Sequence, residues 1–298
     1  MDKLQSIKVF IEVAKCQSFS EAALTLNMSA PAVTRAVAAL EDRLRVKLLN
    51  RTTRLVRLTA PGLRFLHDAE NILESLNEAE CAASGVYSKP AGTLTVTAPV
   101  LFGQKYIMPI IQEYLDTYPD VRVKAVFFDR VTSLLEEELD VAIRIGYLKD
   151  SSLYATQVGQ VRRVVCASPR YFIHKGVPMH PSDLADHDII YPETYESRPE
   201  WKFQHQGVIE TVKLEPRLSC NQNAAALKAA LDGYGITRLM SYQVAQELAN
   251  GTLQDVLTSY EGEPLPVSIL HIEGRRTNAK IRTFIDLAAA RLKKSLIF

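Results

Sequence analysis

Arg35 lies in a stretch of the chain whose residue types suit the reading of DNA base edges. Apolar residues recur there at helical spacing and predict a stripe that faces a domain core: Val33, Val37, Leu40 and Leu44. Ala32, Thr34 and Arg35 fall off this stripe, near the N-terminal end of the predicted helix. A guanidinium can pair with two acceptors of guanine, and a small side chain can contact a thymine methyl group. We therefore expect this end of the helix to enter a major groove.

Two helices that meet at a short turn would position these side chains. Ser20 and Ser29 each precede an apolar series, and serine is a favoured N-cap residue. Pro31 follows the second serine, in the first turn, where proline is well tolerated. Only Asn27, Met28 and Ser29 separate the two predicted helices. A turn this short forces a steep crossing, which is the arrangement of a helix-turn-helix.

A basic hairpin is predicted after the second helix. The segment from Lys47 to Leu58 reads as two short strands, and its tip carries Arg51, Thr53 and Arg54. Such a hairpin would be a wing whose arginines and threonines suit phosphates or a minor groove. The alternative is a surface hairpin whose arginines are merely solvated.

The distribution of charge favours DNA binding over that alternative. Residues 1–60 hold ten Lys or Arg against five Asp or Glu, which is a net charge of +5. The whole chain carries +1, so the remaining residues carry −4. A positive charge confined to one end of a chain is typical of a nucleic-acid-binding module.

The N-terminal segment resembles the LysR-type transcriptional regulators. The resemblance is carried by Leu4–Phe10, Ser18–Ala23 and Leu58–Gly62, and it continues weakly but in order to the C-terminus. Members usually have Gln immediately before the Pro-Ala pair of the recognition helix, where this chain has Ala30. The resemblance implies a DNA-contacting set made of Ser29, Ala30, Pro31, Ala32, Thr34 and Arg35, with Arg51, Thr53 and Arg54 from the wing.

A long helix is predicted after the wing. Thr59 is a plausible N-cap, Pro61 lies in the first turn, and no residue breaks the helix before Gly85. A stripe of this kind packs into a core when the helix is short, but its length here favours a seam between two helices. A dimer would then bind a two-fold symmetric operator with half-sites about one helical turn apart. Apolar residues four and three apart form the predicted dimerisation seam: Phe65, Ala69, Ile72, Leu76, Ala79, Ala83 and Val86.

The remaining chain alternates strands and helices. Ser88–Gly92 reads as a hinge, and the strands and helices after it predict a largely parallel sheet flanked by helices. The predicted strands of the first set are 93–98, 121–128 and 141–145, with helices at 105–118 and 134–139. A second set begins at 163–167, and the strand 267–271 and helix 279–292 are predicted to return to the first.

The predicted fold class is therefore α/β, with three parts. They are a winged helix-turn-helix rich in helix (1–59), a linker helix for dimerisation (60–88), and an effector-binding domain (89–298). The family resemblance implies that this last domain is bilobal and like a periplasmic binding protein. Subdomain I would comprise 93–161 and 268–298, and subdomain II would comprise 162–267.

A ligand of such a domain would bind at the carboxyl ends of the strands, between the lobes. The helix N-termini near Gly103 and Ala224 would suit an anionic effector, while the apolar loop 100–102 would suit a partly hydrophobic one. The alternative is that Arg144 only ties the lobes together and Asn221 only caps a helix. The candidate effector-binding residues are Val100, Leu101, Phe102, Gly103, Phe128, Asp129, Arg144, Gly146, Asn221, Gln222 and Asn223.

No motif in the sequence predicts catalysis. A Gly-rich phosphate loop, a metal-binding His pair and a nucleophile elbow are all missing, so no catalytic residue, metal or cofactor is expected. His180, Asp183 and His187 read as a polar loop. The cysteines at 16, 81, 166 and 220 form no close pair and indicate buried thiols in a reducing cytoplasm. Without a signal peptide or a long apolar run, we expect a soluble, cytoplasmic protein.

The sequence thus predicts a transcriptional regulator of the LysR type, controlled by a small molecule. Its expected partners are a pseudo-palindromic DNA operator, the effector and further copies of itself, as a homodimer or as a homotetramer built from two dimers. RNA polymerase is a further candidate partner. Two alternatives stay open: an enzyme on the same lobes with an accessory DNA-binding arm, and an architectural protein that ignores metabolites. Turnover of a bound ligand would favour the first, and DNA binding that no metabolite alters would favour the second.

Overall fold

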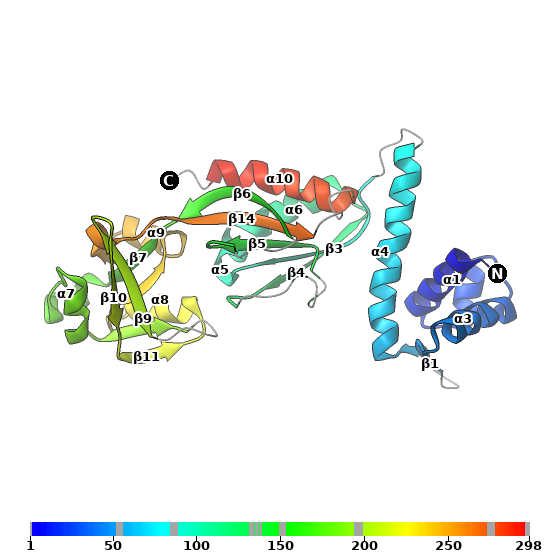
Figure 1. Ribbon diagram of the computed structural model, residues 1–298, viewed down its shortest axis with the longest axis horizontal. Coiled ribbons are helices and arrows are strands. Elements are labelled where there is room, and N and C mark those ends of the chain that lie inside the picture. Colours follow the sequence, from blue (N-terminus) through cyan, green and yellow to red (C-terminus); the bar gives the residue numbers. More distant parts are fainter. Residues whose placement is uncertain are drawn as a thin grey trace. The chain divides into compact units, whose positions relative to one another are not determined.

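The computed structural model describes residues 2–51, 56–83, 89–130, 134, 137, 139–148, 153–193, 199–272 and 278–295. The chain divides into two compact units, Met1–Lys89 and Pro90–Phe298, each with its own core (Figure 1). Within the described residues, no helix has the length and apolar character needed to cross a membrane.

Unit 1 opens with a winged helix-turn-helix. Its elements are α1 (Lys3–Cys16), α2 (Phe19–Thr25), α3 (Ala30–Leu44), β1 (Leu49–Arg51) and β2 (Val56–Leu58). The two strands pair antiparallel, which confirms the predicted hairpin. The predicted N-cap Ser20 is wrong, because Ser18 holds the extended conformation at the start of α2 and its hydroxyl accepts from the Glu21 N–H at 3.3 Å. Ser20 lies inside the first turn.

The turn between α2 and α3 uses a left-handed residue. Asn27 has φ +50°, a conformation that asparagine tolerates better than most residues. The Met28 N–H then donates to the Ala23 carbonyl at 2.9 Å, which closes α2 and reverses the chain. Ser29 stands at the N-cap of α3 and Pro31 lies in the first turn, as predicted, although the Ser29 side chain makes no capping hydrogen bond.

The buried face of α3 follows the predicted stripe except at its end. Val33, Val37 and Leu40 are at most 1% exposed, whereas Leu44 is 39% exposed. The prediction for Leu44 is wrong because the helix ends there and Arg45, at φ +55°, turns the chain away. Ala36 completes the buried face.

Helix α4 (Ala60–Ala83) follows the wing and packs on the same core through its first turns. The Phe65 ring lies 5.5 Å from that of Phe10, and Ala69 is fully buried. Both residues thus pack on the core of unit 1 of the same chain, and Ala69 has no exposed surface left for a second helix. Ile72 is 56% exposed. Of the rest of the predicted seam, Leu76 is half-buried, whereas the side chains of Ala79 and Ala83 and all of Val86 lie outside the described residues.

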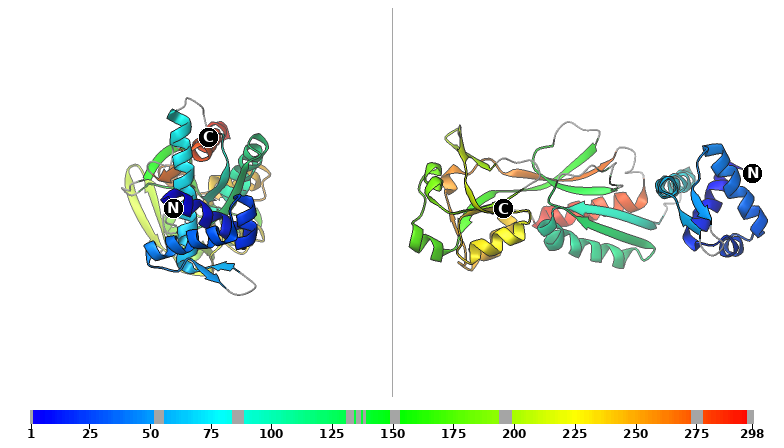
Figure 2. Two further views of the ribbon diagram at one scale, coloured as in Figure 1. Left: turned by 90° about the vertical axis from the view of Figure 1, so that its right-hand side faces the viewer. Right: turned by 90° about the horizontal axis from the view of Figure 1, so that it is seen from below.

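Lobe I of unit 2 is a five-stranded sheet with two helices on one face. The sheet is mixed rather than largely parallel: β3 pairs parallel with β4 and β5, whereas β14 pairs antiparallel with β5 and β6. The Tyr114 hydroxyl of α6 donates to the Lys280 carbonyl of α10 at 2.8 Å, and Figure 2 shows these helices side by side. The elements are β3 (Gly92–Ala98), α5 (Val100–Phe102), η1 (Gly103–Ile107), α6 (Met108–Thr117), β4 (Val121–Phe127), β5 (Val141–Ile145), β6 (Leu153–Val161), β14 (Leu265–Ile272) and α10 (Ala279–Ser295).

Lobe II is inserted between β6 and β14. Its β12 and β13 pair antiparallel with β7, β11 pairs parallel with β8, and a bridge between Ile189 and Ile236 links the two groups. The return to lobe I begins at Leu265, before the predicted residue 268. The elements are β7 (Arg163–Ala167), α7 (Pro169–Lys175), η2 (Pro181–Asp186), β8 (Ile189–Pro192), β9 (Glu200–His205), β10 (Val208–Lys213), β11 (Pro216–Cys220), α8 (Asn223–Leu231), β12 (Thr237–Met240), α9 (Ser241–Ala249), β13 (Gln254–Val256) and η3 (Thr258–Tyr260).

A close backbone approach joins α4 to the wing and leads to a testable prediction. The N–H of Gly62 donates to the Thr59 hydroxyl at 2.9 Å, which confirms Thr59 as the N-cap. A Cβ on Gly62 would lie 1.9 Å from the carbonyl oxygen of Leu48. Gly62→Ala should therefore lower the free energy of unfolding of segment 1–89 by about 1–3 kcal/mol, despite the better helix propensity of alanine.

Urea unfolding followed by circular dichroism would measure this loss. Arg64→Ala, on an exposed side chain of the same turn, is the control and should stay within about 0.5 kcal/mol of the parent. An equal effect of both substitutions would contradict the role given to Gly62.

Candidate DNA-binding and effector sites

The N-terminal end of α3 is the exposed part of the helix-turn-helix. Ser29, Ala30, Pro31 and Arg35 are exposed, and Ala32 and Thr34 are half-buried. In the described part of the chain, the Arg35 guanidinium makes no hydrogen bond or ion pair. None of its five N–H donors is used by a described residue. Of the predicted wing contacts, Thr53, Arg54 and the side chain of Arg51 lie outside the described residues.

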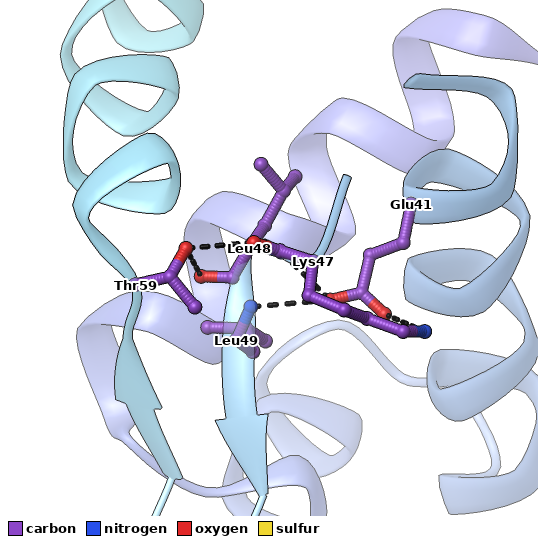
Figure 3. A network of polar contacts seen from close by, with 5 residues as sticks. All are labelled: Glu41, Lys47, Leu48, Leu49 and Thr59. Atoms are coloured by element: carbon purple, nitrogen blue, oxygen red, sulfur yellow. Dashed lines mark hydrogen bonds and ion pairs between the residues drawn. The ribbon is translucent and has the colours of Figure 1, made fainter. Parts of the chain in front are cut away.

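A buried carboxylate fixes α3 relative to the wing (Figure 3). Glu41, on the C-terminal half of α3, is 2% exposed, and its Oε1 accepts from the N–H groups of Leu48 and Leu49 at 2.9 and 3.1 Å. Its Oε2 accepts from Lys47 Nζ at 2.9 Å. On the other side, the Thr59 hydroxyl donates to the carbonyl of Lys47 at 2.7 Å. The segment 47–49 is therefore bonded both to the recognition helix α3, through Glu41, and to the start of α4, through Thr59.

The hydrogen bonds decide the charge state of Glu41. Burial alone would raise the pKa of this carboxyl, but the Lys47 ammonium and the two backbone N–H groups outweigh burial and hold the pKa below its ordinary value. Glu41 is thus a charged group whose acceptors are used inside the protein. Sequence analysis missed it, because nothing local distinguishes Glu41 from Asp42.

The predicted effector residues of lobe I gather at the carboxyl ends of β3, β4 and β5. Asp129 Oδ1 accepts from the Val100 N–H at 3.0 Å, whereas its Oδ2 is buried and has no hydrogen-bond partner among the described residues. The helix that was predicted to begin near Gly103 begins at Val100 instead. The Val100 N–H at its start is bonded by the Asp129 carboxylate, and the prediction of an anion site at this helix end stays a prediction.

Two predicted effector residues belong to the core. Phe102 is fully buried, and its ring lies 5.2 Å from that of Tyr242. A Cβ on Gly103 would lie 2.6 Å from the Phe127 ring, so Gly103 is a packing residue. Val100 and Leu101 are half-buried. The part of the loop that a ligand could touch is thus smaller than predicted.

The other predicted residues of lobe I lie beside the same strand ends. The Arg130 guanidinium stacks 4.6 Å from the Phe128 ring, and Arg144 Nη1 donates to the Arg130 carbonyl at 3.2 Å. Gly146 has φ +119° and open space where a Cβ would stand. The bonds of Arg144 described here lie within lobe I.

The predicted residues of lobe II are not joined to these. Asn221 and Gln222 are exposed, and in the described chain no side-chain hydrogen bond links Asn221, Gln222 or Asn223 to lobe I. Gln222, rather than Asn221, stands at the N-cap of α8, without a side-chain cap. The residue that does connect the lobes is Tyr242, which sequence analysis missed. Its carbonyl accepts from Lys105 Nζ at 3.0 Å, and its ring contacts those of Phe102 and Tyr106.

Thiols and histidines have local roles. Cys166 is buried, and burial raises its pKa to about 12, whereas Cys16 and Cys220 are only half-buried, which corrects the prediction of buried thiols for those two. Asp183 accepts from the N–H groups of Met179 and His180 at 3.0 and 2.9 Å, so this polar loop caps η2. Among the described residues, no cluster of His, Cys, Asp or Glu could hold a metal ion.

The fold defines a class of protein: a DNA-binding helix-turn-helix on the same chain as a two-lobed α/β unit. A family model described as the bacterial regulatory helix-turn-helix protein of the lysR family matches residues 4–63. A second, described as the LysR substrate binding domain, matches residues 88–293. The chain therefore belongs to the LysR-type transcriptional regulators, and the predicted family and fold class are confirmed.

Individual relatives are similar over nearly their whole length. The chain is 30% identical to an uncharacterized HTH-type transcriptional regulator of Escherichia coli, over 99% of this chain and 100% of the relative. It is 30% identical to the HTH-type transcriptional activator AaeR of Escherichia coli, over 96% and 93%. The solved structure of CrgA, a LysR-type transcriptional regulator from Neisseria meningitidis, is 29% identical and has a TM-score of 0.62, over 97% of this chain and 98% of CrgA.

Family membership fixes the general function. The protein is a transcriptional regulator with a DNA-binding helix-turn-helix and an effector-binding domain. The alternative of an enzyme with an accessory DNA-binding arm has no support, because the relatives are named as regulators.

The Glu41 network leads to a prediction on stability. Glu41→Ala leaves two buried N–H groups without an acceptor and should lower the free energy of unfolding of segment 1–89 by about 2–4 kcal/mol. Lys47→Ala is the matched control and should cost less than about 1 kcal/mol, because the Lys47 side chain is 70% exposed. Similar losses in the two variants would show that the backbone bonds of Glu41 are unimportant.

Acid should remove the same stabilisation. Because folding lowers the pKa of Glu41, its contribution is fully present above the ordinary value of 4.5 and is lost as the pH falls through the folded value. Thermal melts between pH 6 and acid should therefore bring the parent and Glu41→Ala closer together as the pH falls. A constant difference would count against this linkage.

Proposed function

We propose that this regulator reads a two-fold symmetric operator with the N-terminal end of α3. The observation that carries the proposal is Arg35, an exposed guanidinium without a partner in the described chain, on a helix that Glu41 ties to the wing. The proposed base-reading and backbone-contacting residues of α3 are Ser29, Ala30, Pro31, Ala32, Thr34 and Arg35. Arg51, Thr53 and Arg54 of the wing would contact phosphates or the minor groove.

The proposed dimer forms through the later turns of α4. Ile72 is a large apolar side chain that is 56% exposed, and a second copy of α4 would cover it. Leu76, Ala79, Ala83 and Val86 continue the same stripe. Two such dimers would form the tetramer. The DNA-bound regulator would contact RNA polymerase. Because the proposed operator is chromosomal DNA, the protein would work in the cytoplasm.

The proposed effector binds between the two lobes of unit 2. Support comes from the gathering of Val100, Phe128, Asp129, Arg144 and Gly146 at the strand ends of lobe I, and from the buried oxygen of Asp129 that has no partner among the described residues. Such an oxygen is costly to bury without a donor. A ligand that donates to it while touching lobe II would favour one arrangement of the lobes and so alter DNA binding.

Arg35 provides the test of base reading. Arg35→Ala should weaken the cognate site by about 1–3 kcal/mol and relax sequence preference, because a bidentate contact to guanine would be lost. Operator sequences would be selected from a random duplex pool, and binding to the selected and scrambled duplexes would be measured by fluorescence anisotropy.

Arg43→Ala is the matched control, because Arg43 is an exposed arginine at the other end of α3. It should leave the ratio of cognate to scrambled affinity unchanged. If Arg35→Ala also leaves that ratio unchanged, Arg35 is not a base reader.

Ile72 provides the test of the dimer. Ile72→Glu would bury a carboxylate opposite its symmetry mate and should dissociate the dimer. Leu63→Glu is the control, because Leu63 is 59% exposed but lies on the opposite side of α4. Sedimentation of segment 1–89 should give a monomer only for Ile72→Glu. A dimer in both variants, or a monomer in both, would refute this seam.

A further inference from the structure

Arg238 is an arginine of lobe II whose charge has no counter-ion in the described chain. It lies on β12 and is partly buried. Its guanidinium stacks 5.0 Å from the Trp201 ring and 5.9 Å from the Phe203 ring. Nη1 donates to the Lys202 carbonyl at 3.1 Å, which is its only hydrogen bond among the described residues. Within the described part of lobe II, most of its donors are therefore unused.

Arg163 is a second arginine of lobe II that has no counter-ion in the described chain. It is the first residue of β7, directly after the chain enters lobe II, and in the described chain it makes neither an ion pair nor a side-chain hydrogen bond. Its neighbour Arg162 differs, because Arg162 Nη1 lies 2.6 Å from the carboxylate of Glu261. Of these two adjacent arginines, Arg162 is paired with a carboxylate, whereas Arg163 has no ion pair among the described residues.

The strand register places Arg163 and Arg238 on one face of the sheet. In the antiparallel pair of β7 and β12, Arg238 stands opposite Val165 and Met240 stands opposite Arg163. Residues two apart on a strand share a face, so the two arginines are diagonal neighbours. Such positions of an antiparallel pair are typically about 7–8 Å apart. The charge of Arg163 reaches Arg238: burial and that charge lower the pKa of Arg238 from 12.5 to about 9. Like charges on neighbouring positions repel, and an anion bound between them would relieve this repulsion.

Arg163 also faces lobe I. The Tyr147 hydroxyl, beyond the end of β5, is close enough to favour the charged form of Arg163, although burial lowers the pKa of this arginine overall. Tyr147 is 69% exposed, and its hydroxyl donates to Glu263 at 3.2 Å. Tyr147 of lobe I therefore lies near Arg163 of lobe II.

We propose that Arg163 and Arg238 form an oxyanion-binding site in lobe II, which takes the carboxylate or phosphate group of a small molecule. Planar guanidinium groups bind both of these anions in a bidentate manner. That this anion is part of the effector rests on the proposed function; that the site binds an oxyanion does not.

Trp201 reports on the site directly. It is the only tryptophan of the chain, is 2% exposed and lies under the guanidinium of Arg238. Full-length protein would be titrated with sodium malonate, sodium acetate or sodium phosphate at constant ionic strength, with sodium chloride as the reference. A saturable change in Trp201 fluorescence is expected for at least one oxyanion and not for chloride. Malonate against phosphate distinguishes a carboxylate ligand from a phosphate ligand.

Two substitutions make the test specific. Arg163→Gln removes a side chain that has no ion pair or hydrogen bond among the described residues, and it should raise the dissociation constant about tenfold or more, since one charge-assisted contact is lost. Arg162→Gln is the matched control and should leave the constant unchanged. No saturable change with any oxyanion, or equal affinity in the parent and Arg163→Gln, would overturn the site.

The DNA assay separates this proposal from the proposed function. Arg163→Gln should bind DNA like the parent when no oxyanion is present, because Arg163 lies in unit 2. If the oxyanion binds in the fluorescence assay but leaves DNA binding unchanged, the site stands and its role as effector site fails. If the parent protein binds no DNA selectively, the proposed function fails while the fluorescence result still decides the site.

Discussion

The N–H groups of Leu48 and Leu49 need an acceptor in a buried place, and Glu41 supplies it. Because this carboxylate comes from α3, the recognition helix cannot shift along its axis without stranding two backbone donors. The same segment is held from its other side by Thr59, whose N–H donates to the Leu48 carbonyl at 2.9 Å. The approach of Gly62 to that carbonyl leaves no room for a side chain. Helix, wing and α4 therefore form one rigid joint.

Unit 2 uses acidic side chains in the same way. Asp140 Oδ2 accepts from the Thr95 N–H at 2.9 Å, in the buried part of the lobe I sheet. Asp129 accepts from the N–H of Val100 at the start of α5. Each of these carboxylates accepts a hydrogen bond from a backbone N–H group. Among the described residues, the second oxygen of Asp129 is buried without a hydrogen-bond donor.

The sequence predicted most of unit 1, because its signals are local. Helical spacing, the short turn at Asn27 and the cap at Thr59 each depend on residues a few positions apart. Errors arose where two nearby residues give the same signal, as with Ser18 and Ser20, or where a stripe outlasts its helix, as with Leu44. A heptad stripe also cannot say which partner covers it. Phe65 and Ala69 are covered by α1 of the same chain, and no pattern within α4 indicates this.

The candidate site of unit 2 was predicted less well for a physical reason. Strand ends were placed correctly, so Asp129, Arg144 and Gly146 do lie together. What fills the space between them depends on contacts across long stretches of sequence, such as that of Lys105 with Tyr242. Arg163 and Arg238 look like ordinary strand arginines in the sequence. Only the register of β7 and β12 shows that they share a face.

One apolar stripe of α4 is buried at its start and exposed further along. Its first turns are packed into the core of unit 1, so the orientation of α3 relative to α4 is fixed by the same contacts that fold the domain. The exposed Ile72 lies further along the same helix. A dimer formed there would hold two recognition helices at a set distance, because neither the joint at Leu48 nor the packing of Phe65 permits rotation. The spacing of the two half-sites would then be a property of α4 rather than of the wing.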